Sequence, residues 1–179
     1  MNRTRRGVLA GATTLLACAA GCTGRHGQHR GEPDDERVGW EWDGSVPVER
    51  VTQHHQPSCG CCDEYVGYLE GHGVDVRVEA ESDFEAFVAT KDELGVPSSM
   101  RSCHTVEFGD YVVEGHVPLE AIGALFETDS SAHGVAIPGM PQHAPGMGQP
   151  SEEPLTTYAF GERGEASEFL DVDREPPRS

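Results

Sequence analysis

The chain has 179 residues, with 31 acidic against 13 basic side chains and a formal net charge of −18. This length suits one modest domain with tails and argues against a large multidomain enzyme. Phosphate backbones and anionic headgroups repel so acidic a chain, so we expect no nucleic-acid partner. Lys91 is the single lysine. An acid-rich, lysine-poor surface stays hydrated in concentrated salt, and our hypothesis is a halophilic protein.

Residues 1–22 have the pattern of an export signal. Three arginines precede an apolar stretch at residues 7–17 that is too short to span a bilayer. Residues 4–9 resemble a twin-arginine signal, and the four residues ending at Cys22 resemble a lipobox, with Cys18 as a second candidate. We expect an exported, extracytoplasmic lipoprotein on the cell surface, attached to the membrane only through lipidated Cys22. An ordinary cleaved signal is the alternative.

The rest of the chain divides by composition into a stalk, a domain and a tail. Residues 23–44 are rich in Gly, His and acidic side chains, which predicts a flexible stalk. Residues 45–160 carry the hydrophobic periodicity of one folded domain. We expect residues 161–179 to form a disordered tail.

Within the domain, strand-like alternation and helix-like periodicity follow one another. The patterns predict strands at residues 46–52, 74–78, 105–108 and 111–114, and helices at residues 62–71, 82–94 and 118–126. The resulting order, β-α-β-α-β-β-α, predicts a thioredoxin-like α/β sandwich with ferredoxin-like layering. An irregular, methionine-containing loop and a short edge strand at residues 158–160 follow.

Four cysteines lie within the domain: Cys59, Cys61, Cys62 and Cys103. The first three fall between the first strand and the first helix, where a helix N-terminus favours thiolates. Cys103 enters the third strand, which the topology places opposite that loop. Four converging thiolates suit Cu(I), Zn(II) or an iron–sulfur centre.

The spacing narrows the choice of metal. A zinc site usually takes two separate cysteine pairs, whereas Cys61 and Cys62 are adjacent and diverge. Adjacent thiolates suit bridging of several Cu(I) ions. Three alternatives stay open: structural disulfides in an exported protein, a zinc site, and a redox-active Cys59/Cys62 pair in a C-x-x-C arrangement.

Further soft or imidazole donors accompany the cysteines. Met140 and Met147 lie in a loop without hydrophobic periodicity, where they can be ligands or part of a lid. His104 and His116 are candidate ligands or supporting groups, with hydrogen-bonded structural histidines as the alternative. We expect His54 and His55, which follow the first strand, to be solvated.

The chain resembles CopG-like proteins, a family of exported, cysteine-rich proteins (domain-of-unknown-function family 411) that are often linked to copper resistance. The resemblance spans residues 48–147. It is carried by five motifs: Cys59-Gly60-Cys61-Cys62, Gly95-Val96-Pro97, Ser102-Cys103-His104-Thr105, Val113-Glu114-Gly115-His116-Val117-Pro118 and Pro138-Gly139-Met140-Pro141. It implies a thioredoxin-like fold and a multinuclear Cu(I)–thiolate site built from the four cysteines.

The chain departs from the family pattern at two places. Tyr65 stands where the family usually has Trp, which is a packing change. His143-Ala144 stands where the family has Gly-Ser, and His143 can add a ligand.

We therefore expect an exported metal-binding protein, rather than a conventional enzyme, that sequesters Cu(I) or hands it on. A copper exporter or a redox partner would receive the ion, and Cu(I) oxidation is a further hypothesis. The alternative is a thioredoxin-like thiol–disulfide oxidoreductase that uses Cys59 and Cys62.

Overall fold

The computed structural model describes residues 40–128 and 130–173. Every described residue belongs to the second of two units of the chain, residues 1–30 and residues 31–179. The predicted export signal, Cys22 and Cys18 therefore lie outside the described residues. Within the described part, no helix is long and apolar enough to cross a membrane.

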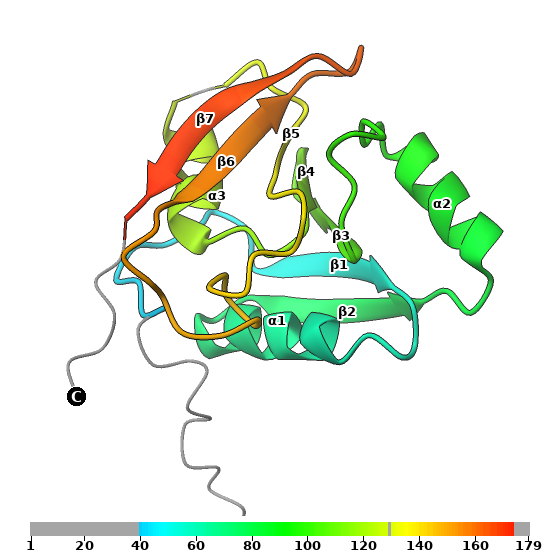
Figure 1. Cartoon of the computed structure of the whole chain (residues 1–179), viewed down its shortest axis with the longest axis horizontal. Coiled ribbons are helices and arrows are strands. Elements are labelled where there is room, and N and C mark those ends of the chain that lie inside the picture. Colours follow the sequence, from blue (N-terminus) through cyan, green and yellow to red (C-terminus); the bar gives the residue numbers. More distant parts are fainter. Residues whose placement is uncertain (1–39, 129, 174–179) are drawn as a thin grey trace, which may run out of the picture. The chain divides into compact units, whose positions relative to one another are not determined.

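The described residues form a mixed α/β fold, as predicted (Figure 1). In chain order the elements are β1 (Arg50–His55), α1 (Gly60–Gly71), β2 (Asp75–Ala80), α2 (Phe84–Glu93), β3 (His104–Phe108), β4 (Tyr111–Glu114), α3 (Leu119–Glu127), β5 (Gly134–Ala136), β6 (Leu155–Phe160) and β7 (Ala166–Val172). Through α3 this is the β-α-β-α-β-β-α order predicted from the sequence.

The seven strands form one sheet in the order β2-β1-β3-β4-β5-β6-β7. β1 runs parallel to β2 and antiparallel to β3, and β3 runs antiparallel to β4. In the register between β1 and β3, His55 at the end of β1 lies opposite His104 at the start of β3. The loop after β1 and the residue before β3 therefore meet at one edge of the sheet.

The helices form where capping and apolar spacing agree. The side chain of Asp83 accepts a hydrogen bond from the Ala86 N–H at 3.0 Å and so caps α2. Pro118 precedes α3, whose Leu119, Ile122 and Leu125 are fully or almost fully buried. This spacing places the apolar face of α3 in the core, as its sequence predicts.

The first strand begins later than predicted. It spans Arg50–His55 instead of residues 46–52, because Pro47 lacks an N–H for the ladder, and Val46 and Val48 pack against the core from a loop. The expectation that His54 and His55 are solvated is wrong.

Both histidines of β1 have protein partners. The imidazole of His54 pairs with Glu107 at 2.8 Å. His55 is buried, and its Nδ1 lies 2.9 Å from the side-chain amide of Gln53.

The C-terminal part of the chain adds three strands to the sheet. β5 pairs with β4 and β6, and β7 pairs with β6 in an antiparallel hairpin. The expectation of disorder from residue 161 is wrong for residues 161–173. Gly164 adopts a positive φ of 83° in the turn, and Val172 packs into the core.

The expected stalk also ends earlier than residue 44. Trp40 is only 1% exposed and packs in the main hydrophobic core. Its indole N–H donates to the carbonyl of Gly148 at 3.0 Å. A buried aromatic ring with a satisfied N–H belongs to the folded domain, so the stalk prediction is wrong from Trp40 onward.

Candidate metal centre

The cysteine loop is held by backbone hydrogen bonds at the start of α1. The N–H groups of Cys62 and Asp63 donate to the carbonyl of Cys59 at 3.1 and 3.3 Å. From the sheet, the side-chain amide of the buried Gln53 donates to the carbonyl of Cys62 at 2.9 Å. These contacts fix the loop before any metal binds.

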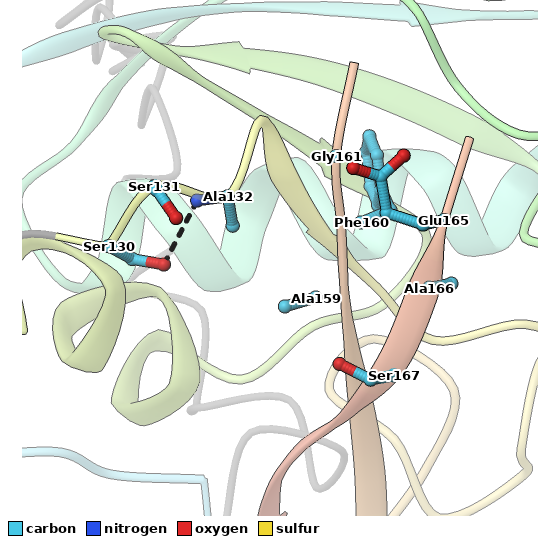
Figure 2. A pocket seen from close by; sticks show the side chains of 9 residues that line it. All are labelled: Ser130, Ser131, Ala132, Ala159, Phe160, Gly161, Glu165, Ala166 and Ser167. Atoms are coloured by element: carbon cyan, nitrogen blue, oxygen red, sulfur yellow. Dashed lines mark hydrogen bonds between the residues drawn. The ribbon is translucent and has the colours of Figure 1, made fainter. Parts of the chain in front are cut away.

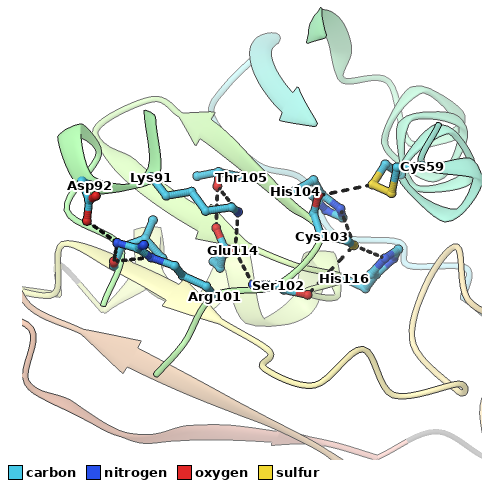
Figure 3. A network of polar contacts seen from close by, with 12 residues as sticks. Cys59, Lys91, Asp92, Arg101, Ser102, Cys103, His104, Thr105, Glu114 and His116 are labelled. Carbon is cyan, nitrogen blue, oxygen red and sulfur yellow. Dashed lines mark hydrogen bonds and ion pairs between the residues drawn. A yellow bond between two sulfur atoms is a disulfide. The ribbon is translucent and has the colours of Figure 1, made fainter. Parts of the chain in front are cut away.

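The structure brings the four predicted cysteines together. The sulfur atoms of Cys59, Cys61, Cys62 and Cys103 all lie within 4.8 Å of one another. Cys61 Sγ is 3.6 Å from Cys59 Sγ and 4.0 Å from Cys103 Sγ. Cys59 and Cys62 are joined by a disulfide, drawn at Cys59 in Figure 3. Cys61 and Cys103 are free thiols. Thiolate binding of a metal by all four requires this disulfide to be reduced.

Two buried imidazoles contact the thiol of Cys103. Its Sγ lies 3.3 Å from His104 Nδ1 and 3.1 Å from His116 Nε2, and the three ligand atoms lie within 4.8 Å of one another. His116 Nδ1 is 2.7 Å from the carbonyl of Pro145. Because a carbonyl only accepts, the proton sits on Nδ1 and the Nε2 lone pair faces Cys103. Cys103 is thus shared by a four-sulfur group and a Cys–His–His group.

Burial sets the protonation of these groups. It lowers the pKa of His116 from 6.5 to about 4 and that of His104 well below its usual range, where the neighbouring His116 lowers it further. Burial, reinforced by the nearby Cys61, raises the pKa of the Cys103 thiol from 9.0 to about 12. At neutral pH the site therefore presents two neutral imidazoles and a protonated Cys103, whose proton a bound metal would displace.

The predicted methionines lie beside the cysteines. Met140, 43% exposed, lines a groove of about 360 Å³ together with Cys59 and Cys103. Met147 lines a second hollow of about 410 Å³ with Cys61. His143 is half-buried and belongs to neither of the donor groups found among the described residues.

The sequence did not predict the part played by two tyrosines of α1. The Tyr65 hydroxyl donates to the carbonyl of Val117 at 2.7 Å, and the Leu119 N–H donates to the Tyr68 hydroxyl at 2.9 Å. The Tyr65 ring also lies 4.6 Å from that of His104, centroid to centroid. The tyrosines therefore hold the segment after His116 against α1. The sequence signal that could have indicated this role is the spacing of three residues between the tyrosines, which places both on one face of the helix.

Another groove offers no comparable donors. It encloses about 340 Å³ beside β6 and β7, where Figure 2 shows small side chains, serine hydroxyls and the carboxylate of Glu165. No cysteine, histidine or methionine lines it. Soft metals have no suitable ligand set there.

Gly146 holds the methionine loop against α1, and we predict that Gly146→Ala disrupts it. Gly146 has a φ of +74°, and an added Cβ would lie 2.7 Å from the Tyr65 backbone nitrogen. We expect a loss of about 1–3 kcal/mol in the free energy of unfolding, measured in urea. Gly164→Ala is the control, since its φ is +83° but a Cβ there meets nothing within 4 Å. Equal losses in the two variants would contradict this role.

Stability should decrease in mild acid because of the buried histidines. Folded His116 has a pKa of about 4 against 6.5 for the unfolded chain, so its stabilising contribution is complete above pH 6.5 and is lost as the pH falls toward 4. Between pH 7 and pH 5 we expect His116 to account for about 2 kcal/mol of lost unfolding free energy. Urea unfolding of the wild type and His116→Gln at both pH values tests this, and identical pH dependence would contradict it.

Comparison with known proteins gives the family of this chain. A family model described as "Protein of unknown function, DUF411" matches residues 100–147, and no curated protein sequence matches the chain. The solved structure of copper resistance protein CopG, form 1, is 35% identical with a TM-score of 0.62, and the match covers 72% of this chain and 99% of that one. Form 2 is also 35% identical with a TM-score of 0.62, over 70% of this chain and 98% of that one. The chain belongs to the CopG-like copper-resistance family.

Proposed function

We propose that the protein binds Cu(I), several ions per chain, through Cys59, Cys61, Cys62 and Cys103, and contributes to copper resistance. The observation that carries this proposal is the convergence of four sulfur atoms within 4.8 Å of one another. Thiolates are soft ligands that select Cu(I). The copper-resistance names of the two structural neighbours support copper as the cargo.

The donors around the cysteines extend this proposal. His104 and His116 are neutral at pH 7 and face Cys103, so both can supply nitrogen ligands. Met140 and Met147 line hollows that reach the cluster and can supply thioether sulfur. A site with several donors close together suits capture, storage and handover of ions to a copper exporter or a redox partner.

A second candidate function follows from the Cys59–Cys62 disulfide at the start of α1. In the order β2-β1-β3-β4 only β3 runs antiparallel to its neighbours, an arrangement that supports a thioredoxin-like core. A thiol–disulfide oxidoreductase would use this pair. The free thiol of Cys61 lies 3.6 Å from Cys59 Sγ, where exchange would scramble the pair, so we favour copper binding.

We further propose that bound Cu(I) is oxidised to Cu(II). Each Cu(I) would lose one electron to an added acceptor, with the cysteines and imidazoles as ligands. Absence of copper-dependent electron transfer to such an acceptor would remove this part alone. Export and anchoring through Cys22 are also proposed, from the N-terminal pattern.

The direct test is an anaerobic titration of the reduced full chain with Cu(I) in high salt, against a competing chelator. We expect several ions bound per chain and the domain thiols protected from alkylation. A Cys18→Ser/Cys22→Ser variant controls for the two cysteines outside the domain. Negligible copper binding together with a reversible disulfide would overturn the proposal in favour of the oxidoreductase.

A further inference from the structure

Behind Cys103 lies a buried ion pair that the proposed ligand set does not use. Lys91 of α2 is 2% exposed and Glu114 of β4 is fully buried, and their Nζ and Oε1 atoms lie 2.6 Å apart. Lys91 is the single lysine of a chain with 31 acidic residues. Its ammonium also lies 4.5 Å from the centre of the Phe87 ring. Lysine side chains are almost never fully buried unless they are paired, so the burial of the single lysine indicates a role other than surface charge.

Stability alone does not explain the pair. Desolvating two charges costs about as much as their attraction returns, and apolar residues of similar volume often serve as well. The Glu114 carboxylate also accepts hydrogen bonds, which an apolar side chain cannot do. Its Oε1 accepts a hydrogen bond from the Ser102 N–H, and its Oε2 accepts one from the Thr105 hydroxyl. The ammonium of Lys91 donates to the same hydroxyl at 2.8 Å.

These contacts bracket the proposed ligands. Ser102 and Thr105 flank Cys103 and His104 on either side, and one carboxylate binds both flanking residues (Figure 3). Thr105 and Glu114 are also cross-strand partners in the β3–β4 register. The segment that carries Cys103 is thereby fixed at both ends from the interior of the sheet.

We propose that Glu114 and Lys91 are positioning residues for the metal site: the Glu114 carboxylate clamps residues 102 and 105, and Lys91 neutralises it. The clamp holds Cys103 Sγ where it faces Cys61 Sγ at 4.0 Å and His116 Nε2 at 3.1 Å. Groups that support a metal ligand typically change metal affinity about 10- to 100-fold when they are removed. This inference rests on the proposed function, because it concerns the position of a proposed copper ligand.

Two double variants separate the clamp from the buried charge. Lys91→Met/Glu114→Met removes both charges and the acceptor for the Ser102 N–H. Lys91→Met/Glu114→Gln removes both charges but retains an amide at residue 114, whose oxygen can accept from the Ser102 N–H and whose NH2 group can donate to the Thr105 hydroxyl, so both contacts can persist. Leu155→Ala, in the core at β6, is the control for general loss of stability. Each full-length protein is reduced anaerobically and titrated with Cu(I) against a chelator, and its unfolding in urea is measured in parallel.

We expect the Met/Met variant to bind Cu(I) about 10- to 100-fold more weakly than the wild type. The Met/Gln variant and Leu155→Ala should stay within about threefold of the wild type. A metal-free readout accompanies the titration: the alkylation rate of Cys103 relative to Cys61, by mass spectrometry, should change in Met/Met and not in Leu155→Ala.

Wild-type affinity in Met/Met, or equal losses in Met/Met and Met/Gln, would overturn the clamp. If Met/Met does not fold, Thr105→Val removes one of the two carboxylate contacts. Unchanged copper affinity and unchanged Cys103 alkylation in that variant would overturn the proposal as well. A wild-type protein that binds no copper contradicts the proposed function instead, and the alkylation ratio still tests the clamp.

Discussion

Cys103→Ser is expected to abolish most of the copper binding, although residue 103 lies 41 positions from Cys62 in the chain. Its sulfur belongs both to the four-cysteine group and to the Cys–His–His group, so one substitution removes a donor from each. A serine hydroxyl is a hard donor that replaces thiolate poorly on Cu(I). The affinity loss should exceed the roughly 10- to 100-fold typical of removing a group that only supports a ligand.

The measurement is the number of Cu(I) ions retained per chain against a competing chelator, with urea unfolding as a check on folding. Cys22→Ser makes the same substitution outside the domain and should leave copper retention unchanged. A Cys103→Ser protein that keeps the wild-type number of ions would exclude Cys103 as a ligand. It would also remove the evidence that ties His104 and His116 to copper, because that evidence is their contact with the thiol of Cys103.

The sequence was sufficient to predict that the cysteines converge. Alternation and helical periodicity gave the order of elements through α3, and that order places the loop after β1 beside the residue before β3. The local sequence pattern was therefore enough to predict the long-range contact between the cysteine loop and Cys103. The functional roles of these residues as ligands stay predictions that the titrations test.

Other features depend on contacts that local pattern does not encode. Trp40 looked like part of a polar stalk because its partner, the carbonyl of Gly148, is 108 positions away. β7 is charged along its exposed face and is ordered by pairing with β6. The clamp by Lys91 and Glu114 joins α2 to β4, and the only sequence signal for it was that the chain contains a single lysine.

Cys61→Ser is expected to distinguish copper binding from disulfide exchange. Cys61 lies outside the Cys59–Cys62 disulfide, so the pair can still form and be reduced in the variant. Its sulfur is 3.6 Å from Cys59 Sγ and 4.0 Å from Cys103 Sγ, a position between the loop and the third strand that suits a bridging ligand. We therefore expect a clear loss of Cu(I) bound by the reduced variant, while Cys59 and Cys62 keep the ability to form their disulfide.

The experiment pairs Cu(I) titration of the reduced variant with the reduction potential of its Cys59–Cys62 pair, and Cys62→Ser is the comparison that should lose both properties. The proposed copper site would need Cys61, because three sulfur atoms at the start of α1 and one just before β3 would have to share several ions. Thiol–disulfide exchange needs only two of them. Full copper retention in Cys61→Ser, with thiol–disulfide exchange activity in the wild type that Cys62→Ser abolishes, would identify the protein as an oxidoreductase in which Cys61 is dispensable.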